Sequence, residues 1–315
     1  MSREEQRMRI LSVESEVKKV FIGRDEPVRL LLTGFISGLS VLIEDIPGVG
    51  KTTLARSLAA ASGLDFGRIQ FTPDLLPGDI TGMTIWNQEK RDFVFKPGSI
   101  MHQFILADEI NRASSRTQSA LLESMQDGSV SVDSVTHPLP EPFFLAATQN
   151  PLSFSGTFKL PEAQVDRFGL SFSIGYPDEG SEAAIVRHAE LECPLAAIKP
   201  SVSPEGLRET RKAVRSISVD EKVVRYIVQI ARETRRSKKL KSGISPRACQ
   251  HLFRAAQASA FLCGRAYALP EDVRSMAGPV LIHRVALSAE ARMGSEAPSE
   301  VLDSLLCSIP MPSGL

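Results

Sequence analysis

Short apolar runs alternate with helical patterns along the first 175 residues. Five runs of three or four mostly apolar residues lie at 41–43, 69–71, 104–107, 143–146 and 170–172. Bounded runs of this length between helices are typical of buried strands in a mostly parallel sheet. The pattern predicts an α/β domain over residues 1–175, with a parallel five-stranded sheet between helices.

From residue 176 the spacing becomes helical and the strand pattern fades. Helical segments are expected at 178–191, 204–215, 219–236, 246–262, 270–287 and 298–308. Proline suits the first turn of a helix and acidic residues suit its dipole, so both mark helix starts. Such starts are Ser203-Pro204-Glu205, Ser245-Pro246 and Pro270-Glu271-Asp272. A smaller all-α domain is therefore predicted over residues 176–315.

Composition and charge narrow the class of protein. The chain has 315 residues, 43% of them hydrophobic and 23% charged, an ordinary balance for about two globular domains. Lys plus Arg and Asp plus Glu each number 37. The net charge of zero gives no overall attraction to nucleic acid or to an acidic membrane surface.

The sequence carries no pattern for secretion or membrane insertion. Its start, MSREEQRMRI, is charged and no apolar core of a signal peptide follows. The longest apolar stretch, 30–43, is broken by glycine, serine and threonine and is too short to span a bilayer. We expect a cytoplasmic protein. The four cysteines are widely spaced and are interpreted as reduced thiols rather than zinc ligands: Cys193, Cys249, Cys263 and Cys307.

The stretch EDIPGVGKTTLA, residues 44–55, lies between the apolar run at 41–43 and a good helix former at 51–61. A strand before and a helix after are the context that a phosphate-binding loop requires. The glycines would turn backbone N–H groups toward a phosphate, Lys51 would reach the β- and γ-phosphates, and Thr52 would bind Mg²⁺. The plain alternative is a glycine-rich turn, and Asp45 stands where the usual pattern has glycine. The expected nucleotide-binding residues are Pro47, Gly48, Val49, Gly50, Lys51, Thr52 and Thr53.

A second motif supplies acids at the end of an apolar run. In FILADEINRA, Asp108 is placed to hold Mg²⁺ and Glu109 to orient or deprotonate the attacking water. The alternative is a solvated acidic pair that begins a loop. A third run, FFLAATQNP, ends on polar residues, where an amide such as that of Asn150 would contact the γ-phosphate or the water. Taken alone, that ending is a turn signal before proline.

These motifs in this order resemble those of AAA+ ATPases, and specifically of the MoxR family. The text that carries the resemblance is VLIEDIPGVGKTTLA, QFTPDLLPGDITG, FKPGSI, LADEINRASSRTQSALLESMQDG, LPEPFFLAATQNP, LPEAQVDRF and GISPRA, between about residues 20 and 286. The family commonly reads Glu-Asp before its phosphate loop, which accounts for Asp45. The resemblance implies a P-loop core, a helical lid, ATP or ADP with Mg²⁺ as cofactors, and hydrolysis of ATP.

The resemblance also implies roles that spacing alone does not assign. Asn150 matches the first sensor, Arg167 the arginine finger that reaches a neighbouring subunit's nucleotide, and Arg247 the second sensor. Each arginine offers a planar, always charged fork of donors suited to phosphate; from the sequence alone, a surface salt bridge is an equal alternative. The adenine contact is expected, by analogy, near Ile22 and Gly23.

An arginine that acts on a neighbour implies an oligomer, and the resemblance implies a ring, with six subunits expected. We expect the ring to remodel or mature a client protein, with a von Willebrand A domain as one candidate feature of that client. Two alternatives are kept open: a slow, nucleotide-gated assembly scaffold, and a nucleic-acid motor or loader. Zero net charge counts against the last.

Two inserts and one basic run complete the candidate surfaces. Residues 75–100 resemble an insert of this family and 128–140 a hairpin before the first sensor. Aromatics of the first insert would contact a client or, more commonly, pack against the hairpin's own base: Trp86, Phe93 and Phe95. The basic run at 235–241 is interpreted as a solvated helix end rather than a nucleic-acid site, because it lacks interleaved aromatics.

Overall fold

The computed structural model describes residues 2–151, 158–188 and 194–312. Five parallel strands form its central sheet. In spatial order the strands are β2 (Phe66–Gln70), β5 (Phe104–Asp108), β8 (Phe144–Gln149), β1 (Val41–Glu44) and β9 (Leu170–Phe172). All four neighbouring pairs are parallel. The predicted parallel five-stranded sheet is thus confirmed.

Alternate residues of each strand face opposite sides of the sheet, as the two-residue period of a strand requires. On β5, Phe104 and Leu106 join a hydrophobic cluster with the N-terminal helices, whereas Ile105 and Ala107 join a second cluster on the other face. Both faces are therefore covered, which explains why the strands read as continuous apolar runs.

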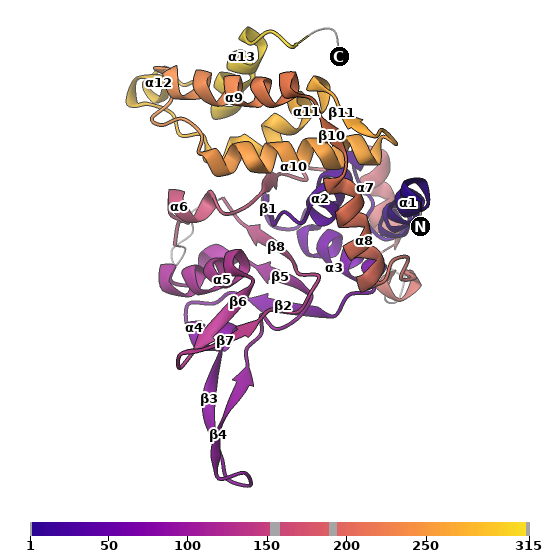
Figure 1. The fold of residues 1–315 in the computed structure, drawn as a ribbon, viewed down its shortest axis with the longest axis vertical. Helices are drawn as coiled ribbons and strands as arrows, with labels where there is room; N and C mark the ends of the chain where they lie inside the picture. Colours follow the sequence, from indigo (N-terminus) through magenta and orange to yellow (C-terminus); the bar gives the residue numbers. More distant parts are fainter. Residues whose placement is uncertain (1, 152–157, 189–193, 313–315) are drawn as a thin grey trace.

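Helices of the α/β core cover these two faces (Figure 1). The elements are α1 (Arg3–Lys18), α2 (Asp25–Ser37), α3 (Lys51–Ser62), α4 (Pro77–Thr81), η1 (Ile110–Arg112), α5 (Ser115–Asp127) and α6 (Glu162–Val165). The first cluster is built with α1, α2 and α3, and the second with α4 and α5. Because the strands are parallel, their carboxyl ends all lie at one edge of the sheet and their amino ends at the other.

The second half of the chain is mainly helical. Its elements are α7 (Glu179–His188), η2 (Pro194–Ala197), α8 (Pro204–Arg215), β10 (Ser218–Val219), α9 (Glu221–Arg236), α10 (Pro246–Leu262), β11 (Tyr267–Ala268), α11 (Pro270–Leu281), η3 (Ile282–Arg284), α12 (Ala289–Met293) and α13 (Pro298–Ser308). We call α9 to α13 the lid. Helix α8 contacts α1 and α2 as well as α10, so it joins the core to the lid; the division of the chain at residue 175 stays a prediction.

Side-chain caps explain why the helix starts were readable from the sequence. The hydroxyls of Ser203 and Ser245 accept hydrogen bonds from the backbone N–H groups of Gly206 and Ala248, at 3.1 Å each, and satisfy donors that a helix start leaves free. The predicted segments 204–215, 246–262 and 298–308 coincide with α8, α10 and α13.

Two expectations for this half differ from the structure. The predicted helix at 270–287 ends at Leu281 because the chain tightens into η3, and a short parallel pair, β10 with β11, interrupts the helical pattern. Residues 189–191 of the segment at 178–191, and Cys193, lie outside the described residues; the other three cysteines are free thiols. Within the described ranges, no helix combines the length and the apolar character needed to cross a membrane.

Two hairpins project from the core beside β2 and α5 (Figure 1). The longer pairs β3 (Gly82–Asn87) with β4 (Asp92–Pro97), and the shorter pairs β6 (Ser129–Val132) with β7 (Val135–Pro138). Trp86 and Phe93 pack edge to face, with ring centroids 5.2 Å apart, and remain 53% and 66% exposed. Phe95 instead stacks on His137 of β7, at 3.8 Å. The hairpins thus brace each other at the base and expose two aromatic rings farther out.

Candidate functional site

The loop between β1 and α3 has the backbone of a phosphate nest. Gly48 and Gly50 have φ angles of 88° and 89°, in the left-handed region that glycine adopts without strain. A Cβ added at Gly48 would meet no atom within 4 Å. The backbone conformation, and not lack of space, therefore requires glycine at that position. The loop ends at the N-terminus of α3, where free N–H groups and the helix dipole favour an anion.

Lys51 begins α3 and lies over this loop. Its Nζ donates to the backbone carbonyls of Asp45 and Ile46, the latter at 3.0 Å. Partial burial lowers the pKa of the lysine, and the carboxylates of Asp45, Asp108 and Glu109 oppose that shift. The cation is held at the centre of the site by acceptors that a phosphate oxygen can replace.

Asp108 ends β5 with both carboxylate oxygens engaged. Its Oδ1 accepts from the Thr148 hydroxyl at 2.6 Å, and its Oδ2 accepts from the Thr52 hydroxyl at 3.2 Å. A hydroxyl and a carboxylate this close are hard oxygen ligands of the kind that Mg²⁺ takes together with phosphate oxygens and water. The described residues hold no group of three or more His, Cys, Asp or Glu side chains arranged for a metal.

Glu109 follows Asp108 in a strained backbone conformation. Its φ of 55° is unusual for a residue other than glycine and is the kind of strain found at functional sites. The backbone N–H donates to Thr148 Oγ1 at 2.9 Å, which holds the residue in place. The carboxylate accepts from Gln70 Nε2 at 3.2 Å and from Arg112 at 2.9 Å. Its orientation is thereby fixed at the mouth of the site.

These groups line one cavity of about 400 Å³ at the carboxyl edge of the sheet. Its lining is Pro47, Gly48, Gly50, Lys51, Thr52, Thr53, Arg68, Gln70, Asp108, Glu109 and Asn150. We call it the phosphate-loop cavity. Of the expected nucleotide contacts, Ile22, Gly23 and Val49 are not among the lining residues. Segment 21–23 still borders the loop, because a Cβ added at Gly50 would lie 3.4 Å from the Phe21 ring.

Sequence reasoning missed two residues of this cavity, Arg68 and Gln70. Both lie on β2, where exposed positions alternate with buried ones. The Arg68 guanidinium donates to Asp108 Oδ2 from Nη2 at 2.6 Å and from Nε at 3.2 Å. The available signal was the polar alternation within FGRIQ, which ends level with Asp108 on the neighbouring strand.

Asp45 has a structural role that explains why it replaces glycine. Its Oδ2 accepts from the backbone N–H groups of Ile174 and Gly175 at 2.8 and 2.7 Å, and its Oδ1 accepts from that of Ile46 at 2.7 Å. The side chain is buried and lies beside the phosphate loop rather than in the nest. We call this set of bonds the Asp45 clasp; it ties the start of the loop to the chain that leaves β9.

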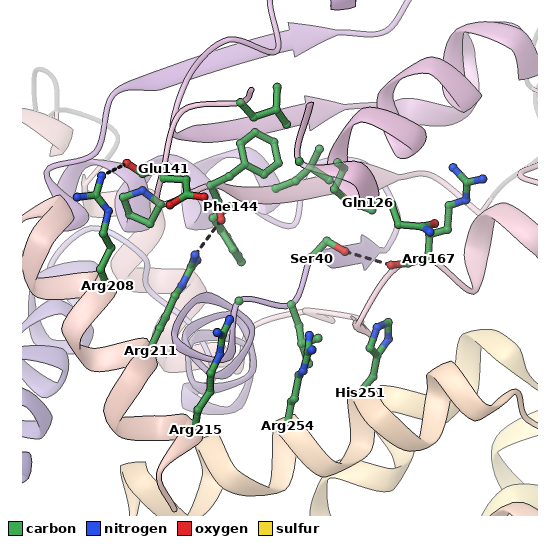
Figure 2. A pocket seen from close by; sticks show the side chains of 18 of the residues that line it. Ser40, Gln126, Glu141, Phe144, Arg167, Arg208, Arg211, Arg215, His251 and Arg254 are labelled. Carbon is green, nitrogen blue, oxygen red and sulfur yellow. Dashed lines mark hydrogen bonds between the residues drawn. The ribbon is translucent and has the colours of Figure 1, made fainter. Parts of the chain in front are cut away.

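Arg167 and Arg247 lie in a different cavity, shown in part in Figure 2, at the amino edge of the sheet. Arg167 precedes β9, and its nearest carboxylate is that of Glu123 at 3.9 Å. Its Nη1 is buried and, within the described part of the chain, has no hydrogen-bond partner. Arg247 lies 3.7 Å from the carboxylate of Asp166. Because all five strands are parallel, these arginines and the phosphate loop of the same chain lie at opposite edges.

The lid is fastened to the core beside Arg167. The side chain of Arg284, 2% exposed, donates to Asp166 Oδ1 at 2.9 Å and to the carbonyls of Asp166 and Phe168. Burial lowers its pKa to about 10 against the opposing charge of Asp166, so it stays charged at neutral pH. The residues on both sides of Arg167 are thus bonded to the lid.

The basic run at 235–241 is mostly paired within the chain. Arg236 meets Glu233 at 3.3 Å, Lys239 meets Glu296 at 2.8 Å, and Lys241 meets Glu162 at 2.8 Å. Arg235 donates to the carbonyl of Ile244. These contacts favour the interpretation as a structural helix end over a nucleic-acid surface.

Comparisons with known proteins agree with this geometry. Residues 40–170 match the ATPase family associated with various cellular activities (AAA), and residues 232–305 match the AAA lid domain. The chain is 40% identical to the uncharacterized protein YeaC of Bacillus subtilis, over 94% of this chain and 92% of that protein. It is 38% identical to Chaperone MoxR1 of Mycobacterium tuberculosis, over 94% of this chain and 81% of that protein.

A solved structure extends the match to the whole fold. The crystal structure of a candidate ATPase from Cytophaga hutchinsonii superposes with a TM-score of 0.91 at 37% identity, covering 99% of this chain and 97% of that one. Sequence and fold agree over nearly the full length, including the lid. The chain belongs to the MoxR family of AAA+ ATPases.

Proposed function

We propose that this chain hydrolyses ATP with Mg²⁺ at the phosphate-loop cavity and uses the reaction, as a ring, to remodel a protein partner. One observation carries the proposal: a phosphate nest, a lysine, and a hydroxyl and carboxylate 3.2 Å apart open into the same cavity. Positioning and electrostatic stabilisation are what phosphoryl transfer mainly needs from a protein.

Each residue has a task that follows from its place. The N–H groups of the loop and Lys51 hold the phosphates, and Thr52 and Asp108 would hold Mg²⁺, which when bound neutralises charge on the phosphate oxygens. Glu109, fixed by Gln70 and Arg112, orients and deprotonates the attacking water. Asn150, at the end of β8, lines the same cavity and reads the γ-phosphate or that water.

The arginines of the amino edge act on a neighbour. They lie in a cavity apart from their own phosphate loop, so Arg167 and Arg247 complete the site of the adjacent subunit. A contact between two different faces is heterologous and closes into a ring when the rotation permits. Six subunits remain the expected number.

The client is inferred to be a protein. A relative at 38% identity is named a chaperone, and the β3–β4 hairpin carries two exposed aromatic rings away from the core. Exposed aromatics at the end of a projecting element suit contact with unfolded or loosely folded segments. A von Willebrand A domain in that client, and the cytoplasm as the compartment, stay predictions from the sequence.

The test is a hydrolysis assay on wild type, Glu109→Gln and Arg167→Ala over a range of protein concentrations. We expect Glu109→Gln to bind ATP but to lose turnover by about a hundredfold or more, because the water loses its base. Arg167→Ala is expected to lose turnover similarly, as removal of an arginine finger costs about 10³ or more.

Mixing the two variants separates a shared site from an internal one. A mixed ring contains interfaces with an intact Glu109 and an intact Arg167, so turnover is expected to recover in part. Wild type that neither binds nor hydrolyses ATP would contradict the proposal. Stimulation by DNA, with none by protein, would favour the motor alternative, and turnover far slower than assembly would favour the scaffold.

A further inference from the structure

A cavity of about 610 Å³ lies between the core and the helices that follow it, at the amino edge of the sheet. Figure 2 shows Arg208, Arg211 and Arg215 along α8 on one side, and His251 and Arg254 on α10. Its remaining wall is formed by residues before β1, at the end of α5, in the segment that leads into β8, and before β9. We call this cavity the cationic hollow.

Its charge is strongly one-sided. The lining contains seven cationic side chains and one carboxylate, that of Glu141. The cations are Arg167, Arg208, Arg211, Lys212, Arg215, Arg247 and Arg254. The whole chain has 37 basic and 37 acidic residues. The excess of cations in this cavity is therefore local and does not follow from the overall composition. A cleft lined by one sign of charge focuses the field and concentrates counter-ions of opposite sign.

Two of the cations serve the fold. Arg211 donates to the carbonyls of Phe35 and Phe143 at 3.0 to 3.1 Å, and Arg208 donates to the carbonyl of Glu141 at 2.5 Å. Burial lowers the pKa of Arg211 to about 10, helped by the charge of Arg215, so it is still protonated at neutral pH. These two arginines hold α8 against the core and add positive potential to the hollow.

Arg215 and Arg254 differ from them. Both side chains are exposed in the hollow, and within the described residues neither makes a salt bridge with a carboxylate. Arg254 lies on the same face of α10 as Arg247 and His251, because residues seven and three positions apart share a helix face. The His251 ring between them stays neutral, since burial and the charges of Arg284, Arg254 and Arg247 lower its pKa to about 3.

We propose that the cationic hollow binds a polyphosphate, and that Arg215 and Arg254 contact it together with Arg247 and Arg167. A chain of phosphates matches several guanidinium forks spread over one cavity, whereas a lone carboxylate would engage one of them. The aromatic side chains of the lining, Phe143 and Phe144, pack into the core, so there is no exposed ring there for bases of nucleic acid to stack on.

The polyphosphate has two possible sources, the nucleotide held by the phosphate loop of an adjacent subunit or a free nucleotide. The first source rests on the function proposed above. It extends that function, because it adds Arg215 and Arg254 to Arg167 and Arg247 as contacts of the neighbour's nucleotide. The second makes the hollow a separate site on every chain. Both sources present the same chain of phosphates to the hollow. The number of ATP molecules bound per chain distinguishes them.

The test measures binding of inorganic tripolyphosphate to the full chain carrying Lys51→Ala, which disables the phosphate loop. Adding Arg215→Gln and Arg254→Gln is expected to weaken binding about tenfold, from the loss of two charge-assisted contacts at a partly open site. Arg232→Gln, at an exposed arginine of α9 outside the hollow, removes one positive charge where the test variant removes two, and should leave the affinity unchanged.

A second measurement follows MgATP binding and assembly of Glu109→Gln by calorimetry and sedimentation. If a neighbour supplies the polyphosphate, one ATP binds per chain and the double arginine change raises the protein concentration needed for assembly. If free nucleotide is the source, two ATP bind per chain and the change removes one. A double variant that matches Arg232→Gln in every measurement overturns the proposal. Failure of the ATPase proposal would give a different result, because Lys51→Ala would then bind MgATP with the affinity of wild type.

Discussion

Asp108 shows how one carboxylate can serve two states of a site. Its Oδ2 accepts at 2.6 Å from Arg68, a side chain 46% exposed, and at 3.2 Å from Thr52. In the function proposed above, the Asp108 carboxylate would hold Mg²⁺. The Arg68 guanidinium balances the charge of this acid, and a divalent cation would have to compete with it for the carboxylate.

We predict that Arg68→Ala lowers the Mg²⁺ concentration needed for half-maximal binding of a fluorescent ATP analogue. The expected change is about two- to fivefold, the worth of a half-exposed ion pair. Arg68→Lys, which keeps the charge without the fork, should fall between. Binding of the analogue is read directly, so the result does not depend on turnover. An unchanged Mg²⁺ requirement in both variants would contradict the competition.

At this scale the sequence predicted the charged centre of the site better than its rim. Lys51, Thr52, Asp108, Glu109 and Asn150 were readable because each follows an apolar strand in a parallel sheet, whose carboxyl ends meet at one edge. Arg68 and Gln70 were not, since an exposed position on a strand has no signature of its own. The separate cavity of Arg167 and Arg247 depends on how the lid packs, which no local pattern encodes.

Among elements, the Asp45 clasp joins the end of β1 to the end of β9. Three backbone N–H groups donate to one buried carboxylate at 2.7 to 2.8 Å. Hydrogen bonds to a charged acceptor are stronger than neutral ones, and their loss leaves buried donors unpaired. A glycine at this position would remove these three bonds and leave the two strand ends joined only by their pairing in the sheet, where Ile43 lies opposite Phe172.

We predict that Asp45→Ala lowers the free energy of unfolding by about 3 kcal/mol, from those unpaired donors. Urea denaturation of the full chain measures it. Asp127→Ala, an exposed acid at the end of α5, is the matched control and should change the value by less than about 0.5 kcal/mol. Equal effects in the two variants would show that the clasp contributes no stability.

Helix bounds in the lid were predictable where a cap marks the start and wrong where tertiary contacts decide the end. Helix α10 begins after Ser245, whose hydroxyl accepts from Ala248. The segment from 270 stops at Leu281 instead, where η3 turns His283 toward the core and its Nε2 meets the Phe168 carbonyl at 3.1 Å. A buried partner, invisible in the sequence pattern, fixed that end.

Across the whole molecule, the junction of core and lid contains two neutral histidines beside a buried cation. Arg284 donates to His251 Nδ1 at 2.7 Å, so that ring nitrogen must stay unprotonated. Burial and then the charge of Arg284 lower the pKa of His251 to about 3, and the pKa of His283 also falls well below its usual 6.5.

We predict that acid loosens this junction. Below about pH 6.5 the unfolded chain takes up protons on these histidines while the folded chain does not, so stability is lost as the pH falls toward 3. The free energy of unfolding should drop by about 1 kcal/mol per histidine and pH unit between pH 6 and 4. Urea titrations at several pH values test this, and His251→Gln with His283→Gln should show a shallower slope. A slope identical to that of wild type would rule out these two groups.

The shortness of β9 has a consequence for communication between copies of the chain. Its three residues, Leu170–Phe172, lie between Arg167 and the N–H groups of Ile174 and Gly175 that donate to Asp45 beside the phosphate loop. In the ring proposed above, a shift of that loop would have only a few peptide units to cross before it reached the Arg167 guanidinium. In a ring of identical subunits this connection would have a direction. Each hydrolysis event would affect the arginine that contacts one neighbouring subunit and not the other.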